Sequence, residues 1–111
     1  MLELIYTLLY LIFPQQEFAK LVIGQVALTT YNNKTYRIDD VTFKLNPTHT
    51  FTKKNGEQIS YVNYYQDVYK IKIRDIKQPL LISRAKARDR RAGQDELIYL
   101  IPELCIMTGK N

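Results

Sequence analysis

The sequence predicts one small domain of mainly β structure with helices. Its 111 residues suit a single domain with a core of its own. Two segments rich in β-branched and aromatic residues surround turn-forming pairs, which indicates hairpins. A tyrosine-rich segment after the second hairpin has helical spacing. With 46% hydrophobic and 24% charged residues, the composition is that of a globular protein.

The start of the chain predicts a lead-in helix over residues 1–16, ahead of a domain over 17–111. Its apolar residues recur at helical spacing: Leu2, Ile5, Leu8, Leu9 and Ile12. Pro14 should end this helix, because the residue before a proline avoids helical geometry. The apolar stretch is too short to span a bilayer, and Glu3 lies where a signal peptide needs positive charge. We therefore expect it to pack on the domain, with no membrane as partner.

Two turn signals predict two hairpins. Residues 21–41 alternate around Asn32-Asn33, and asparagine tolerates the left-handed geometry of a tight turn. Residues 51–54 and 58–59 flank Asn55-Gly56, the strongest short-range turn signal in the chain.

Ser60 is a candidate N-cap for a helix that ends at Tyr69. At 100° per residue, one arc of about 160° holds most of its large side chains. Its members are Tyr61, Val62, Tyr64, Tyr65, Val68 and Tyr69. This face suits a protein core, but so many hydroxyls also suit a wet, anionic site, so both uses stay open.

The last third of the chain predicts two more strands. Leu80 to Ile82 form a short apolar run after Pro79, and Leu97 to Ile101 form another. Pro102 and Glu103 should begin a short helix. No repeat or linker divides the chain.

The net charge of +5 favours a polyanion as partner without establishing one. Most of it lies in a predicted loop that contains one acid, Asp89. The basic residues are Arg84, Lys86, Arg88, Arg90 and Arg91. The loop could equally be a solvated segment that keeps the domain soluble.

Catalysis and metal binding find little support in the residue types. Cys105 and His49 are the single cysteine and histidine, too few for a metal site of these ligands. Asp39 and Asp40 should end a strand and point to opposite faces, so they would not share an ion. We expect no enzyme, no cofactor and no metal. The unpaired cysteine suggests a reducing, intracellular location in the cytoplasm, the nucleus or both.

Several motifs in order resemble the PAZ domain of PIWI-clade Argonaute proteins. They are residues 28–40 (LTTYNNKTYRIDD), Asn46-Pro47, Thr50-Phe51, Tyr64-Tyr65 with Tyr69, residues 78–81 (QPLL), residues 100–105 (LIPELC) and Thr108-Gly109. The resemblance covers about residues 21–109. It implies an OB-like β-barrel, with residues 51–69 as an inserted hairpin and helix. It also implies a fragment of a larger protein that anchors the 3′ end of a small, single-stranded, 2′-O-methylated guide RNA (piRNA-like) in RNA silencing.

The resemblance also assigns candidate RNA-binding residues. Tyr36, Tyr64 and Tyr69 match phosphate-contacting tyrosines, with Tyr65 beside them and Lys34 as a basic neighbour. Phe51 matches the aromatic that packs against the terminal ribose. The expected wall of the sugar pocket is Tyr99, Leu100 and Ile101. The sequence departs from the family pattern at two positions. Thr30 stands where many relatives have a histidine or a basic residue, and Val68 stands where Argonaute relatives often have lysine.

A second function remains open, because OB-like barrels and exposed strand edges also bind peptides. The chain would then be a protein-interaction module that uses the same groove. In either case we expect a monomer in isolation, with the other domains of the parent protein as partners.

Overall fold

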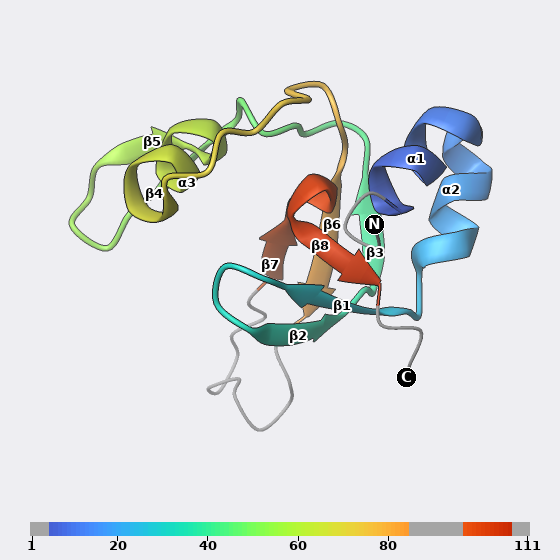
Figure 1. Ribbon diagram of the computed structural model, residues 1–111. Coiled ribbons are helices and arrows are strands. Elements are labelled where there is room, and N and C mark those ends of the chain that lie inside the picture. Colours follow the sequence, from blue (N-terminus) through green and yellow to red (C-terminus); the bar gives the residue numbers. More distant parts are fainter. Residues whose placement is uncertain (1–4, 85–96, 108–111) are drawn as a thin grey trace.

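The computed structural model describes residues 5–84 and 97–107 (Figure 1). The helices are α1 (Ile5–Ile12), α2 (Gln15–Val22), α3 (Tyr61–Tyr69) and the 3-10 turn η3 (Pro102–Leu104). The strands are β1 (Val26–Thr29), β2 (Lys34–Arg37), β3 (Asp40–Thr42), β4 (Thr50–Thr52), β5 (Gln58–Ser60), β6 (Leu80–Arg84), β7 (Leu97–Leu100) and β8 (Cys105–Met107). The predicted mainly-β fold with helices is confirmed.

The strands form three antiparallel sheets. Two have three strands each, in the orders β2-β1-β8 and β3-β6-β7, and together we call them the sheet body. The third is the β4-β5 hairpin, which with α3 forms the insert (residues 50–69). In Figure 1 the insert projects from one side of the sheet body, while α1 and α2 lie on the other. Within the described ranges, strand pairing joins neither the two body sheets to each other nor the insert to them.

Both predicted hairpins are confirmed. In the first, Val26 pairs with Arg37 and Thr29 with Lys34, and Asn33 takes a positive φ of 57° in the turn. In the second, Phe51 pairs with Ile59, and Gly56 has a φ of 91°. The asparagine and the glycine thus occupy the left-handed positions that these turns require.

The start of the chain differs from the prediction. α1 ends before Pro14 as expected, and Leu9 and Tyr10 pack against the core. A second helix, α2, then runs to Val22, into residues predicted to be β and across the expected boundary at residue 16. Phe18 and Val22 are spaced by one helical turn, and both are 0% exposed. No helix among the described residues is long and apolar enough to cross a membrane.

Two short strands were also missed. Asp39 and Asp40 were expected to end a strand, but Asp40 begins β3, which pairs with β6. The Asp39 carboxylate instead accepts a hydrogen bond from the Arg84 N–H at 2.7 Å. After η3 the chain continues as β8, in which Cys105 pairs with Thr29 of β1. The predicted strands at Leu80 and Leu97 are confirmed, and the basic run beyond Arg84 lies outside the described residues.

The buried side chains form two core clusters. The first fills the sheet body beneath α2, with Phe18, Val22, Ala27, Ile38, Leu81, Leu100 and Cys105. The second contains Tyr65 of the insert together with Ile73, Leu80 and Ile101. Because the insert shares no strand pairing with the sheet body, this second cluster supplies much of the apolar contact between them.

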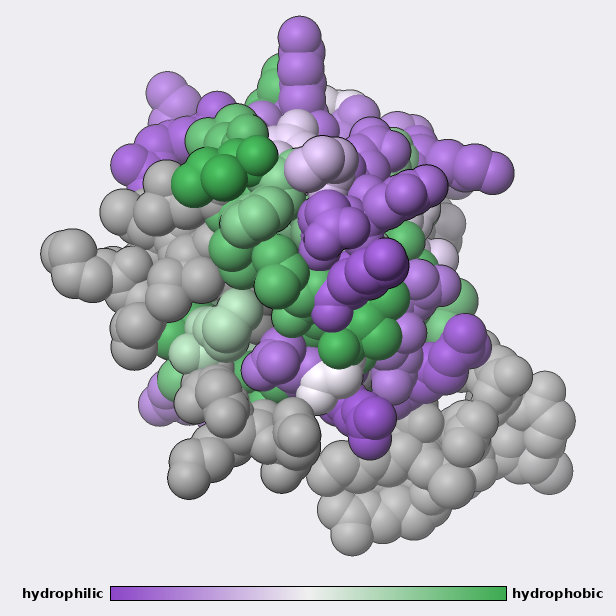
Figure 2. Space-filling view, turned by 90° about the vertical axis from the view of Figure 1, so that its right-hand side faces the viewer, coloured by the Kyte–Doolittle hydropathy of each residue, from purple (hydrophilic) through white to green (hydrophobic). Residues whose placement is uncertain are grey.

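The face formed by α1 and α2 carries exposed apolar side chains. Figure 2 shows this side of the molecule, where hydrophobic surface extends beside a polar region. Leu11 is 67% exposed and Ile12 68%, and Leu21 and Ile23 at the end of α2 are also exposed. This patch lies on the opposite side of the sheet body from the insert.

The segment that returns from the insert (residues 70–79) is held by one carboxylate. Glu103, at η3, has a side chain only 8% exposed. It accepts hydrogen bonds from the backbone N–H groups of Arg74 at 2.9 Å and Asp75 at 3.0 Å, and from the Gln78 amide at 3.0 Å. The Glu103 N–H donates back to Gln78 Oε1 at 2.8 Å. This network satisfies the polar groups of a segment that has no regular structure.

We predict that Glu103→Gln destabilises the fold by about 1 to 3 kcal/mol, because it weakens charge-assisted hydrogen bonds at a buried site. Urea denaturation measures the loss. Glu17→Gln is the matched control, since Glu17 forms only an exposed pair with Lys20 at 3.8 Å and should change stability by less than about 0.5 kcal/mol. Equal stability of the two variants would contradict the role given to Glu103.

Candidate nucleic-acid interface

The helix that carries the tyrosines begins and ends where the sequence predicts. The Ser60 side chain accepts a hydrogen bond from the Asn63 N–H at 3.1 Å, so Ser60 is the N-cap. At the other end Lys70 adopts the left-handed conformation with a φ of 59°. These two caps set where α3 begins and ends, and the packing of its side chains sets which side faces the sheet body.

The tyrosine face of α3 is both core and surface. Tyr65 is buried, with 5% of its surface exposed, whereas Tyr61, Tyr64 and Tyr69 are half-buried. Val68 was expected on the same face but is 53% exposed. By angle it lies within the arc, between Tyr64 and Tyr61, so the helical spacing alone wrongly predicted a place against the core for Val68.

Six aromatic rings form one connected group, which we call the aromatic cluster: Tyr31, Phe51, Tyr61, Tyr64, Tyr65 and Tyr69. Phe51 of β4 lies 4.7 Å from Tyr61 and 5.4 Å from Tyr64, measured between ring centroids. Tyr64 in turn lies 5.2 Å from Tyr65. Most of the contacts are edge-to-face or tilted, the geometries that aromatic pairs prefer.

Tyr31 joins the cluster from the turn between β1 and β2. Its ring lies 5.0 Å from that of Tyr65 and 4.8 Å from that of Tyr69. The hydroxyls of Tyr31 and Tyr65 are 2.9 Å apart and share a hydrogen bond. Burial raises the pKa of Tyr31 to about 12, and burial and the neighbouring Tyr31 raise the pKa of Tyr65 further. Tyr31 was not among the predicted site residues, and its place in the turn beside Asn32-Asn33 was the available signal.

The structure brings four of the predicted site residues together: Phe51, Tyr64, Tyr65 and Tyr69. Tyr99, a further predicted site residue, is half-buried against the second core cluster and lies near Tyr61.

The other predicted site residues are not members of the aromatic cluster, although Ile101 packs in the same core cluster as Tyr65. Lys34 is exposed at the start of β2, and Tyr36, on the same strand, packs against the first core cluster. Leu100 and Ile101, two of the three residues of the expected wall of the sugar pocket, are each 1% exposed and pack in the first and second core clusters.

The accessible part of the cluster has the chemistry of a nucleic-acid interface. The rings of Phe51, Tyr64 and Tyr69 are half-buried, so part of each remains accessible for stacking. Burial raises the pKa of Tyr64, with Tyr69 beside it as a further cause. Its hydroxyl therefore stays protonated at neutral pH and can donate to a phosphate oxygen.

The described residues give no sign of a metal centre. No group of three or more histidine, cysteine or acidic side chains among them could hold an ion. Cys105 is fully buried, and burial raises its pKa to about 12. A neutral thiol of this kind is a poor nucleophile and a poor ligand.

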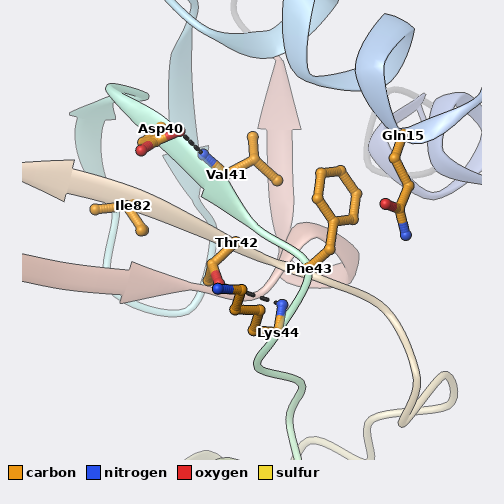
Figure 3. A pocket seen from close by; sticks show the side chains of 7 residues that line it. All are labelled: Gln15, Asp40, Val41, Thr42, Phe43, Lys44 and Ile82. Atoms are coloured by element: carbon orange, nitrogen blue, oxygen red, sulfur yellow. Dashed lines mark hydrogen bonds between the residues drawn. The ribbon is translucent and has the colours of Figure 1, made fainter.

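A hollow of about 670 Å³ lies elsewhere, over β3 and the start of α2 (Figure 3). It is lined by Gln15, Asp40, Val41, Thr42, Phe43, Lys44 and Ile82. Along its floor the Val41 N–H donates to the Asp40 carboxylate at 2.8 Å, and the Lys44 N–H donates to the Thr42 hydroxyl at 3.3 Å. Its lining shares no residue with the aromatic cluster.

Comparison with known protein families identifies the family to which this domain belongs. The PAZ domain family matches residues 12–111, nearly the whole chain. The chain therefore belongs to the PAZ domain family, whose members in Piwi and Argonaute proteins are RNA-binding modules.

Its relatives are PIWI-clade proteins. The Piwi-like protein Siwi of Bombyx mori is 51% identical over 92 residues, which are 83% of this chain and 10% of that protein. The chain thus spans about a tenth of the length of this relative. The crystal structure of Drosophila Piwi superposes with a TM-score of 0.73 at 42% identity, over 93% of this chain and 12% of that one.

A more distant structure shares the fold. The Drosophila Ago-PAZ domain in complex with 3′-end 2′-O-methylated RNA gives a TM-score of 0.57 at 14% identity. The match covers 78% of this chain and 70% of that one.

We predict that the folded protein loses stability as the pH rises from about 10 to about 12. In the unfolded chain a tyrosine releases its proton near pH 10, whereas folded Tyr31 holds it to about 12 and Tyr65 holds it longer. The stabilisation is therefore complete below pH 10 and is lost above it. Urea midpoints across this range measure the effect, and Tyr31→Phe/Tyr65→Phe should show a shallower fall. Equal slopes for both proteins would contradict the assignment.

Proposed function

We propose that this domain anchors the 3′ end of a small single-stranded guide RNA in RNA silencing. The single observation that carries the proposal is the aromatic cluster, because it combines half-buried tyrosines with Phe51 on an insert that shares no strand pairing with the sheet body. Stacking on such rings is tolerant of sequence and contributes about 1 to 3 kcal/mol per base. A domain built in this way would hold a strand by its end and would not read its bases.

The relationship to other PAZ domains supports the nature of the ligand. The Drosophila Ago-PAZ domain, which has the same fold, was solved with an RNA whose 3′ end is 2′-O-methylated. We propose that this domain also accepts a 2′-O-methylated end, of the kind that the PIWI clade uses. The predicted contacts are the hydroxyls of Tyr36, Tyr64 and Tyr69 and the ammonium of Lys34 around the terminal phosphodiester. No catalytic step is assigned to the domain.

We also propose that other domains of the parent protein cover the exposed apolar face of α1 and α2. The relatives are about ten times longer than this chain, and Leu11 and Ile12 on this face are more than half exposed. Apolar patches of this kind mark contact sites more often than free surface.

We predict that Phe51→Ala weakens RNA binding by about 1 to 3 kcal/mol, a factor of roughly 5 to 140, through loss of stacking. Tyr64→Ala should act in the same direction. Fluorescence anisotropy with a short labelled RNA measures the affinity, and circular dichroism shows whether α3 is retained. Phe13→Ala is the matched control, because Phe13 is an exposed phenylalanine at the end of α1. Equal effects of Phe51→Ala and Phe13→Ala would argue against the cluster as the binding site.

We further predict a preference for a free 3′ end. Otherwise identical RNAs should bind in the order free 3′-hydroxyl above 3′-blocked, with a 2′-O-methyl group on the last ribose tolerated or favoured. The dependence on salt should be clear, since phosphate contacts release counterions. A blocked end that binds as well as a free one would overturn end recognition.

The alternative is a protein-interaction module that takes a peptide in the same groove. If Phe51→Ala and Tyr64→Ala folded normally and bound RNA as well as the unmodified chain, the aromatic cluster would serve another ligand. That result would favour a peptide-binding function.

A further inference from the structure

We propose that Tyr31 is a positioning residue, which holds the two halves of the RNA-binding surface in register through its hydroxyl pair with Tyr65. This inference rests on the proposed function. One half is the β1-β2 hairpin, which carries Lys34 and Tyr36, and the other is the insert, which carries Phe51, Tyr64 and Tyr69. Tyr31 itself need not touch the RNA.

The Tyr31–Tyr65 pair connects the β1-β2 turn to the insert, and no other side-chain hydrogen bond among the described residues makes such a connection. Within the described ranges, the Tyr31–Tyr65 contact at 2.9 Å is the one hydrogen bond between side chains that links the insert to the sheet body or its turns. Strand pairing makes no such link. The orientation of the insert therefore depends on side-chain packing, and this pair adds direction to packing that is otherwise apolar.

On the hairpin side, the turn that carries Tyr31 is firmly closed. The Asn33 N–H donates to the Thr29 carbonyl at 2.9 Å, and the Lys34 N–H donates to the Asn32 side chain at 3.3 Å. The hydroxyl of Thr29, which is fully buried, contacts the Asn32 side-chain oxygen and lies 3.2 Å from the Lys34 carbonyl. A shift of Tyr31 would therefore also move Lys34.

On the insert side, Tyr65 has little freedom. It is buried against Ile73, Leu80 and Ile101, and its carbonyl accepts a hydrogen bond from the Ile71 N–H at 3.1 Å. Its ring packs against those of Tyr64 at 5.2 Å and Tyr69 at 5.9 Å. The hydroxyl that Tyr31 holds thus belongs to the ring that orients both predicted phosphate-contacting tyrosines of α3.

A hydroxyl pair of this kind permits a test that separates positioning from stability. Removal of one hydroxyl leaves the other buried without a partner, which is costly, whereas removal of both can be nearly neutral for folding. Tyr31→Phe and Tyr65→Phe should each destabilise the domain, and Tyr31→Phe/Tyr65→Phe should regain most of that stability. If the pair positions the binding surface, RNA affinity should not return with stability, because the directional bond is still absent.

The experiment measures urea stability and RNA affinity for the three variants, using RNAs with free and with blocked 3′ ends. In the double variant we expect stability near that of the unmodified chain. We also expect about three- to tenfold weaker binding of the free end and a smaller ratio of free-end to blocked-end affinity, since a less organised site lowers apparent affinity. Tyr10→Phe is the control, because it removes a hydroxyl that donates to the Lys77 carbonyl outside the cluster.

The outcomes are distinct. Affinity and end preference that recover together with stability in the double variant would reduce the pair to a packing contact and overturn the positioning role. Unchanged affinity in all three variants would overturn it as well. Absence of any end preference in the unmodified chain would overturn the proposed function, and the positioning role with it.

Discussion

The buried carboxylate of Glu103 is the constraint on which the arrangement of the insert depends. Residues 70–79 bring the chain back from α3 to β6 without a helix or strand, so their N–H groups need partners from elsewhere. Glu103 supplies them to Arg74 and Asp75, and Gln78 completes the network. Because Glu103 lies in η3, between β7 and β8, the return segment is tied to the sheet body, and the aromatic cluster acquires a fixed base.

The insert is thus held at two places by two kinds of force. The Glu103 network is polar and acts on the backbone of the return segment. The second core cluster and the Tyr31–Tyr65 pair act on the side chains of α3 itself. This division explains why the tyrosines serve two purposes: Tyr65 is committed to the core, while Tyr64 and Tyr69, on either side of it, keep part of their surface accessible. A leucine at position 65 would fill the core but would leave the hydroxyl of Tyr31 without its partner.

Local signals were sufficient for the local elements. The pairs Asn32-Asn33 and Asn55-Gly56 predicted both hairpins, and Ser60 predicted the start of α3, because each acts within a few residues. The missed elements depend on distant partners: β8 exists because Cys105 meets Thr29, and β3 because Asp40 meets Ile82. The same holds for the site, since Tyr31 and Tyr65 are 34 residues apart and only the fold brings them together. Helix α2 was overlooked because its polar first residues hide the spacing of Phe18 and Val22.

The strand β3 is the outer strand of its sheet, and outer strands are where chains add to one another and aggregate. Here the Val41 N–H, within β3, already donates to the Asp40 carboxylate. The Lys44 N–H, two residues past the end of β3, donates to the Thr42 hydroxyl. An incoming strand would have to displace a carboxylate and a hydroxyl before it could pair. The edge at β3 thus carries some protection of its own against edge-to-edge association, and a peptide ligand at the hollow beside it would meet N–H groups that already have partners.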